Sequence, residues 1–185
     1  MNPQIKVALA LHDFFFANLK LDYAVIGGIA LQFWGDPRFT RAIDLTVQDR
    51  LELAELVQRT TESFGSRVSD PYAFARETRM LLLNVEEVDV DVAIALRGYE
   101  DSLLQKVHPY EVEPGKRVHV CSAEDLIIQE ALAGRPQDLS DIQGVIYRQG
   151  DGLEVRYVRS WLRQFSEALG DPEILARFER AYANR

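Results

Sequence analysis

The segment Tyr23–Val47, YAVIGGIALQFWGDPRFTRAIDLTV, decides the fold. Its first four residues, Tyr23–Ile26, form a short apolar run that predicts a buried strand, and Gly27-Gly28 interrupts that run. Ile29–Trp34 predicts a short apolar helix, which the glycine and proline that follow it would end. Ile43–Val47 then predicts a second strand. The segment therefore predicts a strand, a glycine turn, a helix and another strand in close succession.

Working outward, the remaining patterns extend this mixed architecture. Residues 2–19 predict a helix capped by Asn2, and Asp49 is expected to cap a second helix that ends near Ser63. The β-rich runs Arg79–Val85 and Val88–Leu96 predict a hairpin, and residues 107–120 predict two more short strands. We expect an α/β (α+β) fold with a mixed sheet flanked by helices in residues 1–120. Residues 121–185 predict a C-terminal helical segment packed on it, beginning with a Ser122 cap.

Composition limits the classes of function. The chain has 185 residues, a formal net charge of -8 and a pI near 4.9, which argues against a broad basic surface for nucleic acid. No run of about 18 apolar residues predicts a membrane span, so no membrane partner is expected. The single cysteine, Cys121, cannot form an internal disulfide and is expected to be a small core residue. We expect a cytoplasmic protein.

Acidic residues on two predicted strands are the first candidate for chemistry. Positions 42 and 44 point to one face of their strand, about 6.6 Å apart, and Asp89 and Asp91 do the same in VDVDVAIAL. Carboxylates on neighbouring strands can hold two divalent metals about 3.5–4 Å apart. The alternative is that these acids lie on the solvated face of an antiparallel sheet. Strand alternation alone leaves both interpretations open.

Two further features could serve a ligand. Gly27-Gly28 lies between a strand end and a helix start, where backbone N–H groups and the helix dipole favour phosphate, and Arg38 and Thr40 follow. Asp138 and Asp141 lie three residues apart and could orient a hydroxyl or act as a base. They could equally form ion pairs on a helix face.

Taken in order, these motifs resemble the nucleotidyltransferases of the polymerase-β-like superfamily. The closest resemblance is to the AbiEii-type nucleotidyltransferase toxins of bacterial toxin–antitoxin systems. The glycine pair, the R-x-T of Arg38 and Thr40, and the acidic strand carry it in the first half. The segment SAEDLIIQEALAGRPQDLSDI, residues 122–142, resembles the helical EDLI…K…AGR…D…D segment of that family. The resemblance spans about residues 23–146.

The resemblance implies specific roles. Gly27 and Gly28 would bind a nucleoside triphosphate, and Arg38 and Thr40 would bind phosphate or shape the turn. Mg²⁺ or Mn²⁺ would be held by Asp44 and by Asp91 as the third acid. Asp141 would contribute to catalysis. The implied acceptors are the 3′ end of tRNA or a protein side chain, and the implied protein partner is a cognate antitoxin.

The chain departs from the family pattern twice. Ala42 stands where the first metal-binding Asp is expected, and Glu130 stands where a phosphate-contacting Lys is expected. One unit charge pair at about 4 Å is worth on the order of 4 kcal/mol at an effective dielectric constant near 20. We therefore expect impaired transfer, whether the two residues are natural or engineered. The alternatives are a natural pseudo-nucleotidyltransferase that binds a nucleotide or a partner, and a small-molecule nucleotidyltransferase of the aminoglycoside-resistance kind.

Overall fold

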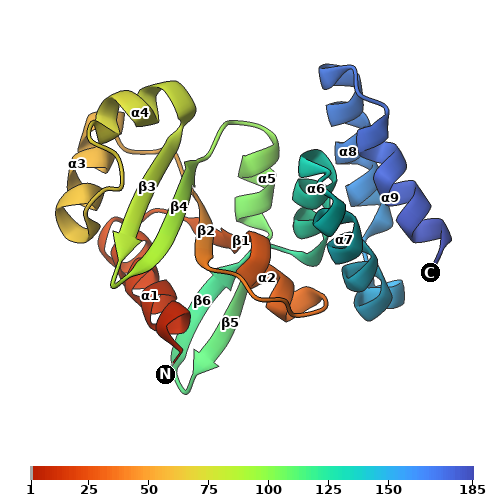
Figure 1. Ribbon diagram of the computed structural model, residues 1–185, viewed down its shortest axis with the longest axis horizontal. Helices are drawn as coiled ribbons and strands as arrows, with labels where there is room; N and C mark the ends of the chain where they lie inside the picture. Colours follow the sequence, from red (N-terminus) through yellow and green to blue (C-terminus); the bar gives the residue numbers. More distant parts are fainter. Residues whose placement is uncertain (1) are drawn as a thin grey trace. The chain divides into compact units, whose positions relative to one another are not determined.

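The computed structural model describes residues 2–185 (Figure 1). The strands are β1 (Tyr23–Ile26), β2 (Ala42–Val47), β3 (Met80–Val85), β4 (Val88–Ile94), β5 (His108–Glu113) and β6 (Lys116–Val120). The helices are α1 (Pro3–His12), α2 (Gly27–Trp34), α3 (Leu53–Phe64), α4 (Pro71–Thr78), α5 (Tyr99–Gln105), α6 (Ala123–Ala133), α7 (Pro136–Gln149), α8 (Val155–Leu169) and α9 (Glu173–Ala183), with a π-helix η1 (Asp13–Asn18) and a 3-10 turn η2 (Gly150–Gly152).

The strands form one sheet in the order β3-β4-β2-β1-β6-β5. Strands β3 and β4 form the predicted antiparallel hairpin, as do β5 and β6. Strand β2 is antiparallel to β1 and parallel to β4. The prediction of a mixed α/β sheet flanked by helices is confirmed.

The alternation along β2 and β4 explains which face of the sheet is buried. On β2, Ile43 and Leu45 are fully buried, while Ala42 and Asp44 on the other face are only partly covered. Strand β4 alternates regularly between buried valines and partly exposed residues such as Asp89 and Asp91. Because successive side chains of a strand point to opposite faces, the apolar set lies in the core and the acids lie together on the other side.

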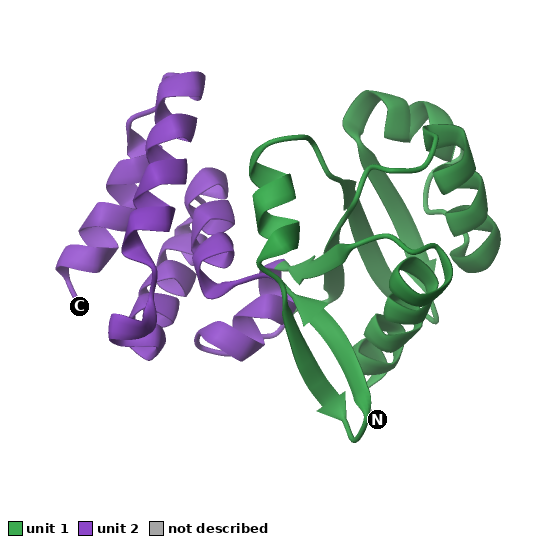
Figure 2. Ribbon diagram, turned by 180° about the vertical axis from the view of Figure 1, so that it is seen from behind, with its two compact units in different colours: residues 1–26, 40–120 green, residues 27–39, 121–185 purple. Residues whose placement is uncertain are grey.

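The chain divides into two compact units (Figure 2). The sheet unit contains residues 1–26 and 40–120, and the helical unit contains residues 27–39 and 121–185. Helix α2 thus belongs with the C-terminal helices and contacts α6 and α7. The predicted division at residue 120 stays a prediction; the structure adds that the segment after β1 joins the helical unit.

Several local expectations are confirmed. Asn2 caps α1, where its side chain accepts a hydrogen bond from Gln4 N at 2.9 Å. Ser122 caps α6 and accepts from Asp125 N at 3.0 Å. Cys121 is buried, as a core residue should be.

Other expectations were wrong or incomplete. Helix α3 begins at Leu53, with Glu52 at its N-cap, so Asp49 caps nothing and instead forms an ion pair with Arg79 at 2.8 Å. Helices α4 and α5 were missed because each is short, with only one or two buried side chains to mark a period.

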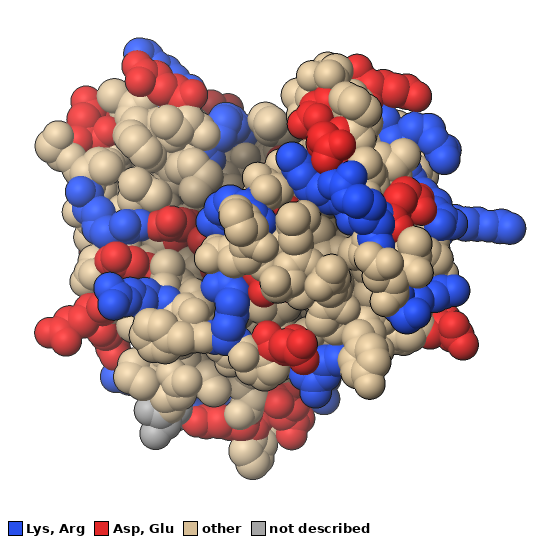
Figure 3. All heavy atoms as spheres, turned by 45° about the vertical axis from the view of Figure 1, so that its right-hand side comes forward, with Lys and Arg blue, Asp and Glu red and all other residues tan. Residues whose placement is uncertain are grey.

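None of the helices within residues 2–185 combines the length and apolarity that a membrane crossing requires. Acidic and basic side chains are interspersed on the face shown in Figure 3.

Replacing Leu45 with Ala tests the assignment of the sheet core. Leu45 is fully buried at the centre of β2, so Leu45→Ala should lower the free energy of unfolding by about 2–5 kcal/mol. Urea denaturation followed by circular dichroism measures this loss. Leu96→Ala is the control, because Leu96 is 59% exposed and its truncation should cost less than about 0.5 kcal/mol. Equal urea midpoints for the two variants would contradict the assignment.

Candidate functional site

The predicted metal acids Asp44 and Asp91 lie opposite each other in the sheet unit. They are register partners on the parallel strands β2 and β4. Neighbouring strands lie about 4.8 Å apart, so the two carboxylates start from adjacent points on the same face. The Asp91 side chain is 34% exposed, which leaves it accessible to a ligand.

The same register pairs Ala42 with Asp89. The four positions 42, 44, 89 and 91 therefore form the corners of a small rectangle on one face of the sheet. Three corners carry a carboxylate and the fourth carries a methyl group. Asp89 also accepts a hydrogen bond from Asn84 Nδ2 at 2.9 Å.

Arg67 supplies the positive charge at this face. Its guanidinium forms an ion pair with Asp91, and its Nε lies 3.7 Å from Asp89 Oδ1. The arginine is fixed by its own backbone N–H, which donates to Leu82 O at 2.9 Å, and by Nε, which donates to Leu83 O at 3.0 Å. The Arg67 guanidinium thus lies near two of the three carboxylates on this face, those of Asp89 and Asp91.

The glycine pair begins helix α2. Ile26, the last residue of β1, is the register partner of Asp44, and Gly27 follows it directly in the chain. Gly27 has φ of 60°, in the left-handed region that favours glycine. The glycine pair is the first turn of the helix rather than a separate turn before it, so its N–H groups are among those that a helix leaves unpaired at its start.

Thr40 shapes the chain that enters β2. Its Oγ1 donates to Ala42 O at 3.2 Å, and its backbone carbonyl accepts from Gln4 Nε2 at 2.8 Å. Of the two roles implied for Thr40, these contacts fit turn geometry.

In the helical unit, Arg38 and Asp141 form an ion pair. Arg38 Nε lies 2.9 Å from Asp141 Oδ2, and Nη2 lies 2.9 Å from the same oxygen. The hydrogen bond to Asp141 is the main cause that raises the pKa of Arg38. Arg38 would have to change partners to bind phosphate, and Asp141 would have to be released to act as a base.

Glu130 belongs to a buried network in the same unit. Helix α6 contacts α2, α7, α8 and α9, so nearly every one of its side chains is covered, and Glu130 is only 5% exposed. Asp138, at the start of α7, accepts hydrogen bonds from Arg135 N, Nε and Nη2 at 2.9, 2.8 and 3.0 Å. Glu130 hydrogen bonds to Asp138 through its carboxyl group, while its Oε2 is buried without a partner among the described residues.

The carboxyl groups of this network titrate differently. Burial, followed by the hydrogen bond and charge of Asp138 and the charge of Asp141, raises the pKa of Glu130 to about 8. Burial would also raise the pKa of Asp138, but hydrogen bonds from Arg135 and Glu130 outweigh it and lower that pKa. A protonated Glu130 that donates to an ionised Asp138 accounts for both directions.

Carboxylate oxygens of Glu130, Asp138 and Asp141 lie within 4.8 Å of one another, so this buried triad could hold a metal ion. Two arginines already neutralise two of its members, Arg38 on Asp141 and Arg135 on Asp138. With Glu130 protonated the network is charge-balanced, which weakens its attraction for a cation.

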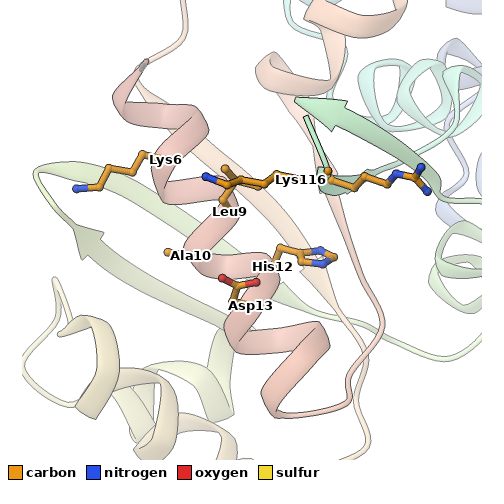
Figure 4. Close-up of a pocket in the computed structure, with 8 residues that line it drawn as sticks. Lys6, Leu9, Ala10, His12, Asp13 and Lys116 are labelled. Atoms are coloured by element: carbon orange, nitrogen blue, oxygen red, sulfur yellow. The ribbon is translucent and has the colours of Figure 1, made fainter. Parts of the chain in front are cut away.

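A separate hollow of about 490 Å³ lies in the sheet unit between α1 and the β5–β6 turn (Figure 4). Its lining residues are Lys6, Leu9, Ala10, His12, Asp13, Gly115, Lys116 and Arg117. Lys6 and Lys116 are paired with Glu86 and Glu113, and no predicted site residue lines the hollow. We therefore do not assign the nucleotide to it.

Sequence reasoning located the acids but missed Arg67. The arginine lies in the connection between α3 and α4, where no motif or periodicity marks it. Its importance depends on the backbone hydrogen bond that fixes it beside β3, which only the tertiary structure reveals.

No protein-family model matches the sequence, and a search of curated proteins finds no match. Three solved structures share the fold. The antibiotic-resistance factor ANT(2″)-Ia is 18% identical over 92% of this chain and 97% of its own, with a TM-score of 0.62. An antigenic nucleotidyltransferase-like protein from Paracoccidioides brasiliensis is 20% identical over 91% and 90%, with a TM-score of 0.52. A Thermotoga maritima protein named as a nucleotidyltransferase is 18% identical over 89% and 96%, also at 0.52. These likenesses show that the chain shares the fold of these three proteins.

Replacing Glu130 with Gln tests the protonated carboxyl. A glutamate in an unfolded chain titrates near 4.3, so between about pH 4.5 and 8 the folded chain keeps a proton that the unfolded chain releases. The contribution of Glu130 to the free energy of unfolding therefore falls as pH rises through that window, by up to about 1.4 kcal/mol per pH unit. Glu130→Gln should remove this slope. Urea denaturation at pH 5, 6, 7 and 8 measures it.

The exposed Glu167 on α8 provides the matched control for this experiment. Glu167→Gln should retain the pH dependence of the unmodified chain. If Glu130→Gln retained it as well, Glu130 would be ionised in the folded protein and the hydrogen-bonded acid–carboxylate pair would be wrong.

Proposed function

We propose that the protein is a metal-dependent nucleotidyltransferase that transfers a nucleoside monophosphate from a nucleoside triphosphate to an acceptor hydroxyl. The observation that carries the proposal is the pairing of Asp44 with Asp91 on adjacent parallel strands. The apolar face of those strands explains the fold, but it does not explain carboxylates facing each other on the opposite face. Two carboxylates that start from adjacent points of one face attract a cation, and Arg67 already provides one to Asp91.

The donor set suits Mg²⁺ or Mn²⁺. Asp44 and Asp91 offer hard carboxylate oxygens from a rigid pair of strands, which these cations prefer over nitrogen or sulfur ligands. The contact of Arg67 with Asp91 supports the same conclusion, because it marks where the strands attract positive charge. A bound divalent ion would supply Lewis-acid polarisation of the phosphoryl group. The two aspartates would hold that ion and orient it.

The triphosphate would be bound by the start of α2. The N–H groups of Gly27 and Gly28 and the positive end of the helix dipole both favour an anion. Glycine allows a phosphate to approach the backbone closely. Arg38 could add a cation if it exchanged Asp141 for phosphate, and Asp141 would then be available to orient the acceptor hydroxyl.

The acceptor proposed first is the 3′ end of tRNA, or a protein side chain, with the protein acting as the toxin beside a cognate antitoxin. This proposal rests on the GG, R-x-T and EDLI…AGR…D…D patterns of the sequence. A cationic small molecule is the second acceptor to test. The net charge of -8 favours it, and the antibiotic-resistance factor ANT(2″)-Ia has the same fold.

A nucleotide-binding pseudoenzyme is the second candidate function. Ala42 removes a carboxylate from the face that would bind metal, and Arg67 already neutralises part of that face. This candidate predicts nucleotide binding without transfer.

Transfer of label from α-³²P nucleoside triphosphates with Mg²⁺ tests the enzyme directly. Total tRNA, protein and aminoglycosides serve as parallel acceptors. Asp44→Asn should lower the rate by at least about 100-fold, because it removes a proposed metal ligand. Asp151→Asn is the control, since Asp151 is exposed in η2 and outside the site, and it should keep the full rate.

The outcome for the unmodified chain separates the two candidate functions. Nucleotide binding with no labelled product from any acceptor would favour the pseudoenzyme. Absence of both binding and transfer would contradict both candidates.

Restoring the residues of the family pattern at positions 42 and 130 should increase the rate of nucleotidyl transfer. Ala42→Asp places a carboxylate beside Asp44 and should raise the rate by at least about 10-fold. Adding Glu130→Lys should raise it further, because the lysine would supply the cation that the family pattern expects. Position 130 is only 5% exposed, and Asp138 and Asp141 beside it are already paired with Arg135 and Arg38, so a circular dichroism melt must first show that the double variant is folded. The same assay measures both steps, and a double variant slower than the unmodified chain would contradict the assigned roles.

A further inference from the structure

We propose that the hollow between α1 and the β5–β6 turn binds a small phosphate monoester that carries an apolar group. The hollow is separate from the proposed function, because no residue that lines it was assigned to the metal or the triphosphate. All of its lining residues lie in the sheet unit. Its volume of about 490 Å³ is within the range of small-molecule sites, which is about 300–1,000 Å³.

The two walls of the hollow are joined through one buried hydroxyl. Tyr23 on β1 is fully buried, and its Oη accepts a hydrogen bond from His119 N on β6 at 3.0 Å. The same Oη lies 2.9 Å from Nδ1 of His12, the last residue of α1. The rings of His12 and His119 also meet edge to face, with their centroids 5.2 Å apart. The hollow is thus part of the packed sheet unit, and a ligand would not have to order its walls on binding.

The charges on the lining are mostly positive. Lys6, Lys116 and Arg117 line the hollow together with a single carboxylate, that of Asp13. Burial is the main cause that lowers the pKa of His12, so this ring is neutral at pH 7. The lining therefore attracts an anion.

Each of the three cations has an acidic partner, but none of these partners lines the hollow. The pairs are Lys6–Glu86 at 2.6 Å, Lys116–Glu113 at 2.9 Å and Arg117–Glu111 at 3.7 Å. In every pair the basic side chain is at least 55% exposed. Ion pairs so open to water contribute little free energy. An anion with more charge than a glutamate can therefore displace these partners.

Charge selects the chemical class of the ligand. A carboxylate would carry the same single charge as the glutamate that it displaces, so the exchange would gain little. A phosphate monoester carries about two negative charges at pH 7 and three acceptor oxygens. The Arg117 guanidinium can bond two of those oxygens at once, and the Lys116 ammonium adds a point charge.

The helix wall of the hollow explains why the ligand should also have an apolar group. Leu9 and Ala10 of α1 line the hollow, Leu9 partly exposed and Ala10 exposed. Figure 4 shows the Lys116 side chain extending from the turn toward Leu9. A phosphate bound by the basic side chains would thus lie near apolar surface, which an attached apolar group could remove from water.

Nuclear magnetic resonance of the ¹⁵N-labelled full chain tests the site, with phenyl phosphate as the probe. The backbone amide signals of residues 6–13 and 115–117 should shift and saturate. Lys116→Gln combined with Arg117→Gln should raise the dissociation constant at least about 10-fold, because charge-assisted hydrogen bonds are lost. Arg163→Gln is the control with the same change of residue type. Arg163 is exposed on α8 in the helical unit, so its loss should change the constant by less than about 2-fold.

Two further ligands test the chemical class. Benzoate has the same ring with a single charge, and it should bind at least about 5-fold more weakly than phenyl phosphate. Inorganic phosphate lacks the apolar group and should also bind more weakly. Circular dichroism melts show that each variant is folded, which we expect because both substituted side chains in the hollow are more than half exposed.

Three results would overturn the inference. The double variant could bind phenyl phosphate as tightly as the unmodified chain does, or benzoate could bind as tightly as phenyl phosphate. Signals could also shift only at the start of α2, with none at residues 6–13 or 115–117. The proposed nucleotidyl transfer would survive each of these results, because the hollow lies outside the residues assigned to it.

Discussion

The parallel pairing of β2 with β4 is the constraint on which the candidate site depends. The apolar residues on one face of these strands are buried, and that burial fixes the register because a shift of one residue would exchange the two faces. Asp44 must then lie opposite Asp91, and Ala42 opposite Asp89. The stability of the core thus determines the spacing of the acids, although the acids themselves add nothing to the core.

Both units use arginine to neutralise carboxylates. In the sheet unit Arg67 serves Asp91 and Asp89, and in the helical unit Arg38 and Arg135 serve Asp141 and Asp138. The planar guanidinium can bond two oxygens at once, which suits this task better than an ammonium group does. Where arginine is lacking the protein uses a proton instead, since the pKa of Glu130 is raised to about 8.

The sequence predicted what depends on local periodicity and missed what depends on tertiary contact. Alternation in AIDLTV and VDVDVAIAL identified both acidic strands and their faces, because period two survives in any sheet. The parallel register could not be predicted, since α3, α4 and β3 separate the two strands in the chain. The contact of Arg67 could not be predicted either, because it depends on a loop that lies beside β3. The burial of Glu130 could not be predicted because it depends on the helices packed around α6.

The contact of Arg67 also bears on how tightly a metal could bind. Arg67 contacts Oδ1 of Asp91, so a divalent ion would either bind the other carboxylate oxygen or displace the guanidinium. Where the ion displaces the guanidinium, the apparent affinity would be the intrinsic affinity multiplied by the fraction of molecules in which Arg67 has left. Because Arg67 is also bonded to Leu82 O and Leu83 O, its release would affect the connection between α3 and α4. Metal binding and the conformation of that connection should therefore be linked, each changing the other by the same free energy.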